Sequence, residues 1–466
     1  MAIVFVLIAL LVLSVLVAGN WYLWRRLFRD TTRAPGAVRR IGVVVIAGGW
    51  AVTFAAFFAT RSGVPFWLKQ VLAWPGYLWL ALCLYLLLAV LVGEAVRPVL
   101  RRVLERRARR TAAAPPGQGP TPVPAAAAAT TAAPAAPAPA ASAPSASAPG
   151  TSRPAAADAP APTGTTTAAP TSGAPDVPDA IEEPAVPVEP AGPSRRLFVS
   201  RVVAGAAAAA AVGTVGYGTY GTVRGPKVKR VTVPLAKLPR AAHGYRIAVV
   251  SDIHLGPVLG RGFAQKVVDT INSTQPDLIA VVGDLVDGTV KELGPAAAPL
   301  AQLRARHGSF FVTGNHEYFS GAEEWVDEVR RLGLNPLENA RTHLPHFDLA
   351  GVNDLAGEDE GQGPDYARAL GDRDRARACV LLAHQPVMVH EAVDHGVDLQ
   401  LSGHTHGGQL WPASYLAAAA NPTLAGLDRY GDTQLYVSRG AGAWGPPTRI
   451  GAPSDITVIE LASKQT

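Results

Sequence analysis

The first quarter of the chain consists of long apolar stretches separated by short arginine-rich ones. Residues 2–24, 41–60 and 73–96 are almost entirely apolar. Each is long enough to cross a bilayer, which takes about 20 helical residues. We interpret all three as membrane spans. The first can also be interpreted as the apolar region of a secretory signal, but it lacks a basic start and a small-residue cleavage site, and arginines follow it.

A change of composition follows the third span. Residues 111–193 are mostly Ala, Pro, Thr, Ser and Gly without apolar periodicity, so they cannot bury enough surface to offset their ordering entropy. We predict a disordered linker there. The next apolar stretch, residues 202–223, follows Arg195 and Arg196. It predicts a fourth span, and the paired arginines favour a twin-arginine export signal, with a simple basic flank as the alternative.

The arginines predict an orientation in the membrane. They crowd between the first two spans and again after the third, whereas the loop between spans two and three holds only Arg61 and Lys69. Because cytoplasmic loops are enriched in Lys and Arg, we expect the two basic segments in the cytoplasm and the C-terminal part outside it. Four basic residues beyond the fourth span oppose this orientation: Arg224, Lys227, Lys229 and Arg230. The basic tail after span three can also be a lipid-binding or nucleic-acid-binding arm, but topology explains it better.

Beyond residue 229 the hydrophobic pattern changes to short apolar runs that alternate with helix-like segments. The predicted strands are Tyr245–Ser251, Leu278–Val282, Ser309–Val312, Leu349–Val352, Cys379–Ala383, Val397–Leu401, Gln434–Val437 and Ile456–Leu461. The predicted helices are Gly262–Ser273, Ala297–Arg306, Ala322–Leu332 and Val387–Asp394. This rhythm predicts a layered α/β domain.

Composition argues against a nucleic-acid site and against a site built from cysteines. The net charge is only +6 and follows the membrane segments, so no nucleic-acid partner is indicated. The chain of 466 residues has two cysteines, Cys83 in an apolar segment and Cys379 in a predicted strand. They provide neither a disulfide framework nor a cysteine metal site.

Five polar clusters stand where predicted strands end. They are Asp252-Ile253-His254, Gly283–Asp287, Gly314–Glu317, Ala383–Gln385 and Gly403–His406. Ligand sites of α/β sheets lie at the carboxyl ends of strands, so we expect these clusters to converge. Carboxylates, an amide and imidazoles without thiolates suit Mn²⁺, Zn²⁺ or Fe. The ligands are too many for one tetrahedral zinc, and two ions that share a bridging carboxylate fit better.

In this order the clusters read D-x-H, G-D-x-x-D, G-N-H-E, H and G-H-x-H. This pattern, over Gly244–Leu461, resembles the calcineurin-like metallophosphoesterase superfamily, and most of all a bacterial branch anchored to the membrane. The resemblance implies a four-layer αββα sandwich and a two-metal phosphoric ester hydrolase. It implies that one metal binds Asp252, His254 and His406, that the other binds Asn315, His384 and His404, and that Asp284 bridges them. His316 would act as an acid near the leaving oxygen.

Neighbouring polar residues have less direct roles in this interpretation. We expect Asp287 and Glu317 to orient ligands or loops. The alternative to an acid role for His316 is a purely structural role. Arg439, after the strand Gln434–Val437, can contact a substrate phosphate or form a structural salt bridge.

The sequence thus predicts a membrane-anchored phosphoesterase that attacks a phosphomonoester or phosphodiester with hydroxide held by two divalent ions. The predicted parts are a three-span region (1–110), a linker (111–193), a twin-arginine-like segment with a fourth span (194–224) and a catalytic domain (229–466). Tethering favours a lipid-linked or envelope phosphate in a multi-pass protein of the cell membrane, and a soluble nucleotide stays open. The alternative function is a non-catalytic, metal-stabilised membrane scaffold or binding protein.

Overall fold

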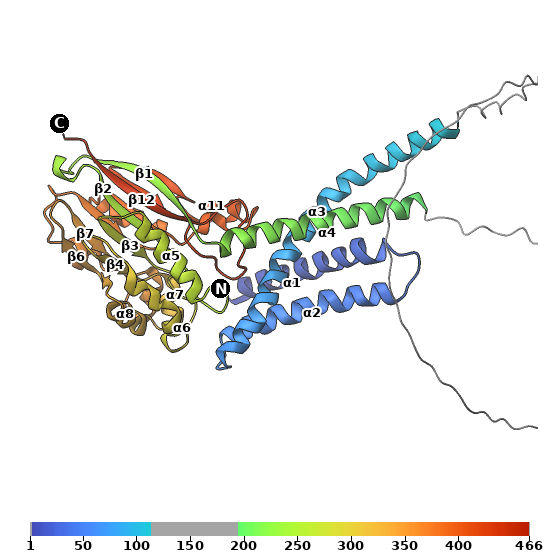
Figure 1. Cartoon of the computed structure of the whole chain (residues 1–466), viewed down its shortest axis with the longest axis horizontal. Helices are drawn as coiled ribbons and strands as arrows, with labels where there is room; N and C mark the ends of the chain where they lie inside the picture. The colour runs from blue at the N-terminus through green and yellow to red at the C-terminus, as the bar shows by residue number, and fades with distance from the viewer. Residues whose placement is uncertain (1, 113–193, 466) are drawn as a thin grey trace, which may run out of the picture. The chain divides into compact units, whose positions relative to one another are not determined.

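The computed structural model describes residues 2–112 and 194–465 (Figure 1). The predicted linker, residues 111–193, lies outside the described residues except for its first two, which belong to helix α3.

Four long helices correspond to the four predicted spans. They are α1 (Ala2–Trp24), α2 (Ala37–Thr60), α3 (Phe66–Ala112) and α4 (Arg195–Val223), and a short π-helix, η1 (Arg25–Arg29), follows α1. Among the described residues, three stretches are long and apolar enough to cross a membrane: Ala37–Thr60, Phe66–Arg107 and Arg195–Val223. Helix α3 has 47 residues and is therefore about 70 Å long, well beyond the predicted span 73–96.

Small residues bring these helices close together. A Cβ atom on Gly49 of α2 would collide with the indole of Trp79 in α3, and one on Gly93 of α3 would collide with Val203 in α4. Helices pack closely in a membrane where glycine removes the side chain from the interface. Leu23, Val90 and Ala207 bury their side chains together and so join α1, α3 and α4.

The remainder of the described chain forms two six-stranded sheets. The first contains, in spatial order, β1 (Lys227–Leu235), β12 (Asp455–Ser463), β2 (Tyr245–Val250), β3 (Leu278–Val282), β4 (Ser309–Val312) and β5 (Asn335–Pro336). The second contains β10 (Gly426–Tyr430), β11 (Thr433–Val437), β9 (Leu399–Ser402), β8 (Cys379–Leu382), β7 (Asp348–Gly351) and β6 (Ala340–His343). Strands β2, β3 and β4 are parallel to one another, as are β7, β8 and β9. Their carboxyl ends therefore lie along one edge of each sheet.

Alternation along the strands divides the core into three layers of side chains. Ile247 and Val249 of β2 face Leu399 and Leu401 of β9, so the two sheets pack face to face. Residues of the opposite parity face helices, because successive side chains of a strand point to opposite sides. Those of β2–β4 pack against α5 (Arg261–Ser273), α6 (Val290–Ala297) and α8 (Ala322–Arg331).

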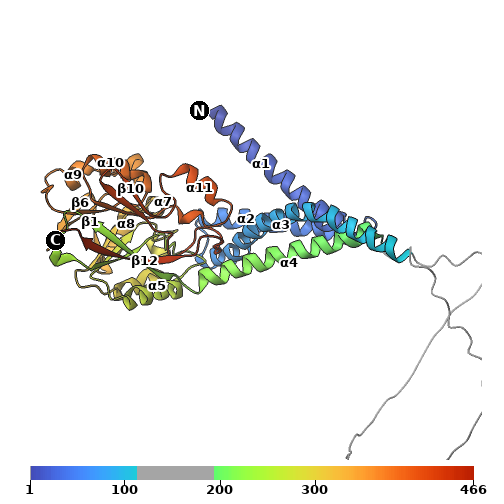
Figure 2. The same cartoon turned by 90° about the horizontal axis from the view of Figure 1, so that it is seen from above.

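The outer face of the second sheet packs against α9 (Tyr366–Leu370) and α10 (Val389–Asp394). In Figure 2, α5 lies on one side of the strands and α9 and α10 lie on the other. The domain is thus the expected four-layer αββα sandwich. Two further short helices are α7 (Asn315–Ser320) and α11 (Ser414–Ala420), and short 3-10 turns, η2 to η6, connect other elements.

The predicted strands and helices of this domain are mostly confirmed, with one wrong helix. Residues 297–306 do not form one helix: α6 ends at Ala297, and Ala298–Gln302 forms a 3-10 turn. Pro295 and Pro299 explain the difference, because proline lacks the amide hydrogen that a continuous helix needs. Strand β1 was not predicted, because its sequence KVKRVTVPL mixes basic and apolar residues at the edge of a sheet.

Candidate metal centre

The five polar clusters do converge, and they do so where the two sheets meet at their carboxyl edges. Asp252 and His254 follow β2, Asp284 follows β3, and Asn315 and His316 follow β4. His384 follows β8 of the second sheet, and His404 and His406 follow β9. Each cluster therefore reaches the site from the end of a buried strand, as predicted.

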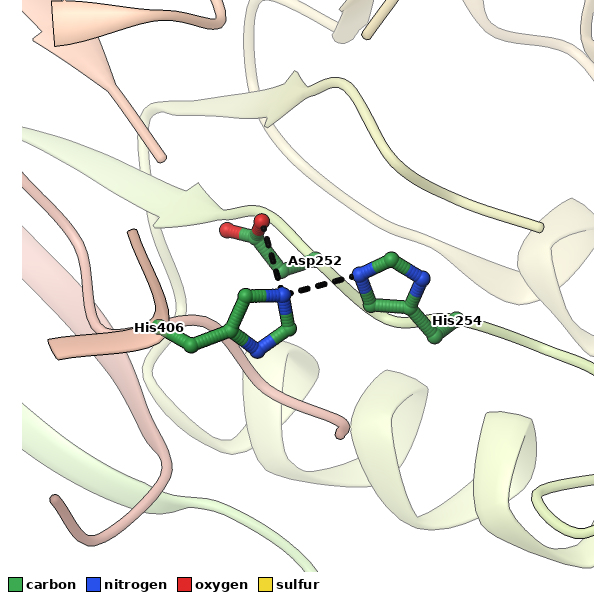
Figure 3. A group of neighbouring side chains, drawn as sticks. All are labelled: Asp252, His254 and His406. Carbon is green, nitrogen blue, oxygen red and sulfur yellow. Dashed lines mark hydrogen bonds and ion pairs between the residues drawn. The ribbon is translucent and has the colours of Figure 1, made fainter. Parts of the chain in front are cut away.

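The first group is Asp252, His254 and His406, whose side chains point toward one another (Figure 3). The Nε2 atoms of His254 and His406 are 2.9 Å apart, and Asp252 Oδ1 is 3.4 Å from His406 Nε2. Three potential ligand atoms from loops 152 positions apart in sequence thus surround one small volume.

The second group is Asp284, His384 and His404, to which Asn315 belongs by contact. His404 Nδ1 is 3.0 Å from Asn315 Oδ1, and His384 Nε2 is 3.2 Å from Asp284 Oδ2, close to it but without a hydrogen bond between them. The same Asp284 oxygen is 3.7 Å from His254 Nε2 of the first group. Asp284 therefore stands between the two groups, where a bridging carboxylate is expected.

An unusual backbone conformation distinguishes these loops. Eight non-glycine residues of the described chain have positive φ, and five of them are Asp252, His254, Asp284, His404 and His406. The left-handed region is unfavourable for residues with a Cβ atom, and such strain concentrates at functional sites. The backbone is thus held in a costly conformation at five of the seven predicted ligands.

The glycines of the motifs are required by close packing. A Cβ on Gly314 would collide with the Asp284 carboxylate, and one on Gly403 would collide with the Asp252 carboxylate. Gly283 combines a φ of +71° with contact to the His384 ring. The glycines before Asp284, Asn315 and His404 therefore let a neighbouring strand end approach.

Burial and proximity shift the pKa values of the site in opposite directions. Burial raises the pKa of Asp252, while the positive charge of neighbouring His384 overcomes burial and lowers the pKa of Asp284 well below its ordinary value. Burial opposes protonation of His254, but Asp287 outweighs it and raises that pKa to about 9. Burial lowers the pKa of His404 to about 4, with a further contribution from His384.

These groups fit a divalent cation chemically. Two carboxylates, four imidazoles and one amide converge, and His384 Nε2 is buried without a hydrogen-bond partner. A buried nitrogen in that state requires a ligand or a water molecule. Carboxylate, imidazole and amide atoms are the ligands that borderline and hard divalent ions prefer.

Asp287 has a larger role than the sequence indicates. Its Oδ1 atom is 2.9 Å from His254 Nδ1 and 2.7 Å from His316 Nδ1, so one carboxylate orients two histidines. Burial opposes ionisation of Asp287, but His254 outweighs burial and lowers its pKa to about 2. Asp287, His254 and His316 also form a third ligand-like group. Because that group shares His254 with the first, we interpret Asp287 as an orienting residue.

Glu317 joins two loops through contacts to backbone amides alone. Its fully buried carboxylate accepts hydrogen bonds from the amides of Asp284, Leu285 and Gly314. Burial, together with the negative charge of Asp284, raises its pKa to about 7. Glu317 thereby fixes the loop that presents Asp284 relative to the loop that presents Asn315, as the prediction of an orienting role anticipated.

Arg449 is a site residue that no motif indicated. Its buried guanidinium donates to the carbonyl oxygens of Gly442, His406 and Ala452, and Nη2 lies 3.0 Å from His406 Nδ1. It therefore positions the loop of His406.

Arg439 packs its side chain near Gly407, and no ion pair of Arg439 is found among the described residues. The remaining predicted acid, His316, has its ring beside Phe319 and Trp444.

Comparisons with known proteins agree with this geometry. The family model for calcineurin-like phosphoesterases matches residues 245–408. A transmembrane protein with a metallophosphoesterase domain from Danio rerio is 40% identical over 250 residues, which are 51% of this chain and 57% of that protein. An uncharacterized metallophosphoesterase from Helicobacter pylori is 38% identical over 242 residues, 51% of this chain and 65% of the relative.

One relative is matched over nearly its whole length. It is an uncharacterized metallophosphoesterase from Aquifex aeolicus, 34% identical over 243 residues, which are 51% of this chain and 92% of that protein. The chain spans only 57% to 65% of the length of the Danio and Helicobacter relatives. Relatives thus occur in animals as well as in bacteria. Together with the converging polar clusters, these matches identify the chain as a member of the calcineurin-like metallophosphoesterase family.

Proposed function

We propose that this protein is a membrane-anchored phosphoesterase with a binuclear metal centre. In this proposal Asp252, His254 and His406 bind one cation, Asn315, His384 and His404 bind the other, and Asp284 bridges them. The observation that carries it is the position of Asp284 Oδ2, 3.2 Å from His384 Nε2 and 3.7 Å from His254 Nε2. One carboxylate oxygen is thereby shared between the two ligand groups.

When bound, two divalent ions (Mn, Zn or Fe) would supply an acidic water molecule and neutralise phosphate charge in an in-line displacement. The contribution of the chain is to hold and move protons beside that centre. His316 Nδ1 faces Asp287, so its Nε2 is left to donate a proton to the leaving oxygen. The Asp287 carboxylate, 2.7 Å from Nδ1, fixes the orientation of the ring for that role.

The proposed orientation places the catalytic domain outside the cytoplasm. Helix α4 carries Arg196 in its first turn, beside other arginines. It reaches the catalytic domain at Gly218, where a Cβ atom would collide with Arg449 and Ile450. The 22 steps between them correspond to about 33 Å of helix, close to the thickness of a bilayer core. A basic end and the catalytic domain at opposite ends of one span support a multi-pass protein of the cell membrane.

The proposed domain organisation keeps the predicted boundaries with one adjustment. Strand β1 begins at Lys227 and pairs with β12 along its whole length, so a catalytic fragment should begin before residue 227 and not at 229. Arg195 and Arg196 form the first turn of α4, behind a Ser194 cap. They are compatible with a fourth span that has a basic flank, and use as a twin-arginine signal stays a proposal.

For the substrate we propose an amphiphilic phosphate ester of the membrane or envelope. Five large apolar side chains near the site are between 49% and 76% exposed, and we call them the apolar rim: Phe319, Trp411, Tyr415, Leu416 and Trp444. The rings of Phe319 and Trp444 lie against the His316 ring, 5.6 and 5.8 Å away between centroids. An exposed apolar patch of this kind beside a polar centre suits a ligand with a charged head and an apolar body.

The apolar rim is continuous with the membrane helices. The Tyr85 hydroxyl, in the middle of predicted span 73–96, donates to the Trp411 carbonyl at 2.8 Å. Gln409, in the same loop as Trp411, connects that loop to Trp444. Its side-chain amide donates to the Trp444 carbonyl and accepts from the Trp444 N–H. An acyl chain could therefore reach the rim from the bilayer without crossing water, which favours a lipid-linked phosphate over a soluble nucleotide.

A non-catalytic scaffold is the rival proposal, in which metals only stiffen a recognition surface. It predicts bound metal without turnover. The complete set of seven ligands together with His316 and its partner Asp287 favours the enzyme, since a scaffold has no need for an oriented acid. Binding of a partner protein and catalysis can also occur in the same molecule, so the two proposals are not exclusive.

The test uses the full chain, purified in detergent with Mn²⁺, and two matched substrate pairs. The diester pair is 4-nitrophenyl ethyl phosphate and 4-nitrophenyl hexadecyl phosphate, and the monoester pair is glycerol 3-phosphate and phosphatidic acid. We expect hydrolysis of at least one pair, with kcat/KM higher for its long-chain member. If the folded, metal-loaded protein hydrolyses none of the four, the scaffold replaces the enzyme.

Two variants separate the substrate class from the enzyme claim. Phe319→Ala and Trp444→Ala should lower the long-chain to short-chain ratio of kcat/KM about tenfold, whereas Val228→Ala, an exposed apolar position of β1, should preserve it. Turnover of short-chain esters with an unchanged ratio in both rim variants would refute the amphiphilic substrate and leave the phosphoesterase intact.

A further inference from the structure

A second charged site lies among the membrane helices, apart from the metal centre. A cavity of about 370 Å³ is lined by seven arginines and one carboxylate, Asp30. Four of the arginines come from η1, the turn after it and the start of α2: Arg26, Arg29, Arg33 and Arg39. The other three come from α3 and α4: Arg97, Arg101 and Arg196. We call it the arginine cavity.

Carboxylates near the arginine cavity neutralise only part of its charge. Arg26 donates to Asp30 at 2.9 Å and to Glu94 at 2.7 Å, and Arg97 is 3.3 Å from Glu94. Arg33 left aside, the other six arginines beside these two carboxylates give a surplus of four positive charges among the described residues. For Arg29, Arg101 and Arg196, the described part of the chain provides no side-chain ion pair.

Two of the arginines that line the cavity have a buried donor without a partner. Arg97 is only 4% exposed, and its Nε atom has no hydrogen-bond partner; the Nε atom of Arg26 is in the same state. Buried N–H groups are almost always bonded, so the arginine cluster as described has more donors than acceptors. An arginine fork matches the oxygens of a phosphate in pairs, which makes phosphate the acceptor that this donor set fits best.

Membrane topology alone does not explain the convergence. The preference for basic residues on the cytoplasmic side requires positive charge near the ends of the spans, and dispersed arginines would satisfy it. Here arginines from separate helices meet in one cavity, where like charges repel each other. Such an arrangement is stable when an anion occupies the centre. Basic pockets between membrane helices are suited to anionic head groups.

We propose that the arginine cavity binds a phosphate-bearing anion, either the head group of an anionic phospholipid or a free phosphate compound. The volume is in the range of small-ligand sites, and the surplus charge suits a ligand with one or more phosphates. The site is independent of hydrolysis at the metal centre, because none of its residues belongs to that centre.

The experiment is native mass spectrometry of the full chain in detergent, titrated separately with phosphatidylglycerol, phosphatidylcholine and inorganic pyrophosphate. The test variants are Arg101→Gln and Arg196→Gln, both exposed enough to leave folding intact. Arg101→Lys keeps the charge but removes the fork. The matched control is Arg102→Gln, which removes the same charge from the adjacent residue, outside the cavity lining. Thermal transitions confirm that all variants are folded.

We expect phosphatidylglycerol to bind at least tenfold more tightly than phosphatidylcholine, and Arg101→Gln and Arg196→Gln each to weaken it about tenfold, with Arg102→Gln near wild type. Tight pyrophosphate binding with the same variant pattern, and no preference among lipids, would support the soluble source. Equal binding of both lipids without pyrophosphate binding would overturn the proposal. So would an equal loss in Arg102→Gln and Arg101→Gln, since that result would indicate unspecific charge.

Discussion

Asp287 Oδ1 lies 2.7 Å from His316 Nδ1, the shortest ion-pair distance of any histidine in the described chain. The same oxygen lies 2.9 Å from His254 Nδ1. The residue predicted to be the acid and a residue predicted to be a metal ligand are therefore held by one carboxylate. A change at Asp287 should affect proton transfer first, and metal binding only through His254.

Asp287→Asn should lower kcat by roughly 10²-fold, because an amide in place of the carboxylate holds the His316 ring less firmly in the orientation that proton donation needs. Bound metal should remain within about twofold of wild type, since none of the seven proposed ligands is removed. Steady-state kinetics and metal analysis of the same preparation check this. Asp327→Asn, an exposed position of α8, is the control. A kcat equal to wild type would show that His316 acts without Asp287, or not at all.

Metal binding should release protons. In the metal-free site the pKa of His254 is raised to about 9, because Asp287 outweighs the opposing effect of burial, and Asp284 in the same way raises that of His384 well above its ordinary value. Both rings therefore carry protons at pH 7 that a cation must displace, so affinity should rise with pH up to about 9. Calorimetry in buffers of different ionisation enthalpy measures the release. Affinity that is constant between pH 7 and 9 would contradict the prediction.

Arg449→Met should destabilise the protein and loosen the first metal position. It leaves the carbonyls of Gly442, His406 and Ala452 without their buried donor, which we expect to cost about 3 kcal/mol in total. Burial lowers the pKa of Arg449 to about 10, so it stays charged at neutral pH.

Arg449→Lys is the informative companion, since it keeps the charge but cannot reach several acceptors at once. We expect an intermediate loss of stability and of metal. Arg429→Met, at an exposed arginine of β10, should leave both near wild type. Full metal retention in Arg449→Met would show that His406 is held by other contacts.

Much of the catalytic domain could be predicted from the sequence, because its strands are short, continuously apolar runs such as Leu278–Val282, all buried. Most of the ligands were visible because they stand in compact motifs rich in glycine and histidine, whereas His384, between Ala383 and Gln385, was indicated only by the other clusters. Arg449 was not visible, since it meets His406 from 43 positions away and no local pattern marks it. The left-handed conformations of Asp252 and Asp284 were equally hidden, because packing of neighbouring strand ends imposes them against local preference.

The membrane region shows the same limit. Apolar length predicted the helices, and the arginine count predicted an orientation. The convergence of Arg26, Arg97 and Arg196 on one cavity depends on helix packing, in which Gly93 lets α3 approach α4 at Val203. Neither helix sequence has a periodic pattern that would predict such a contact.

If seven side chains hold two cations with Asp284 between them, the number of metal ions per chain must be two. The full chain and Asp284→Asn should be purified in parallel, and metal per chain should be measured by plasma mass spectrometry after removal of loosely bound ions. We expect about two divalent ions in the wild type and a loss of at least one, together with turnover, in the variant. A single ion in the wild type, or two ions retained by an active Asp284→Asn, would contradict it.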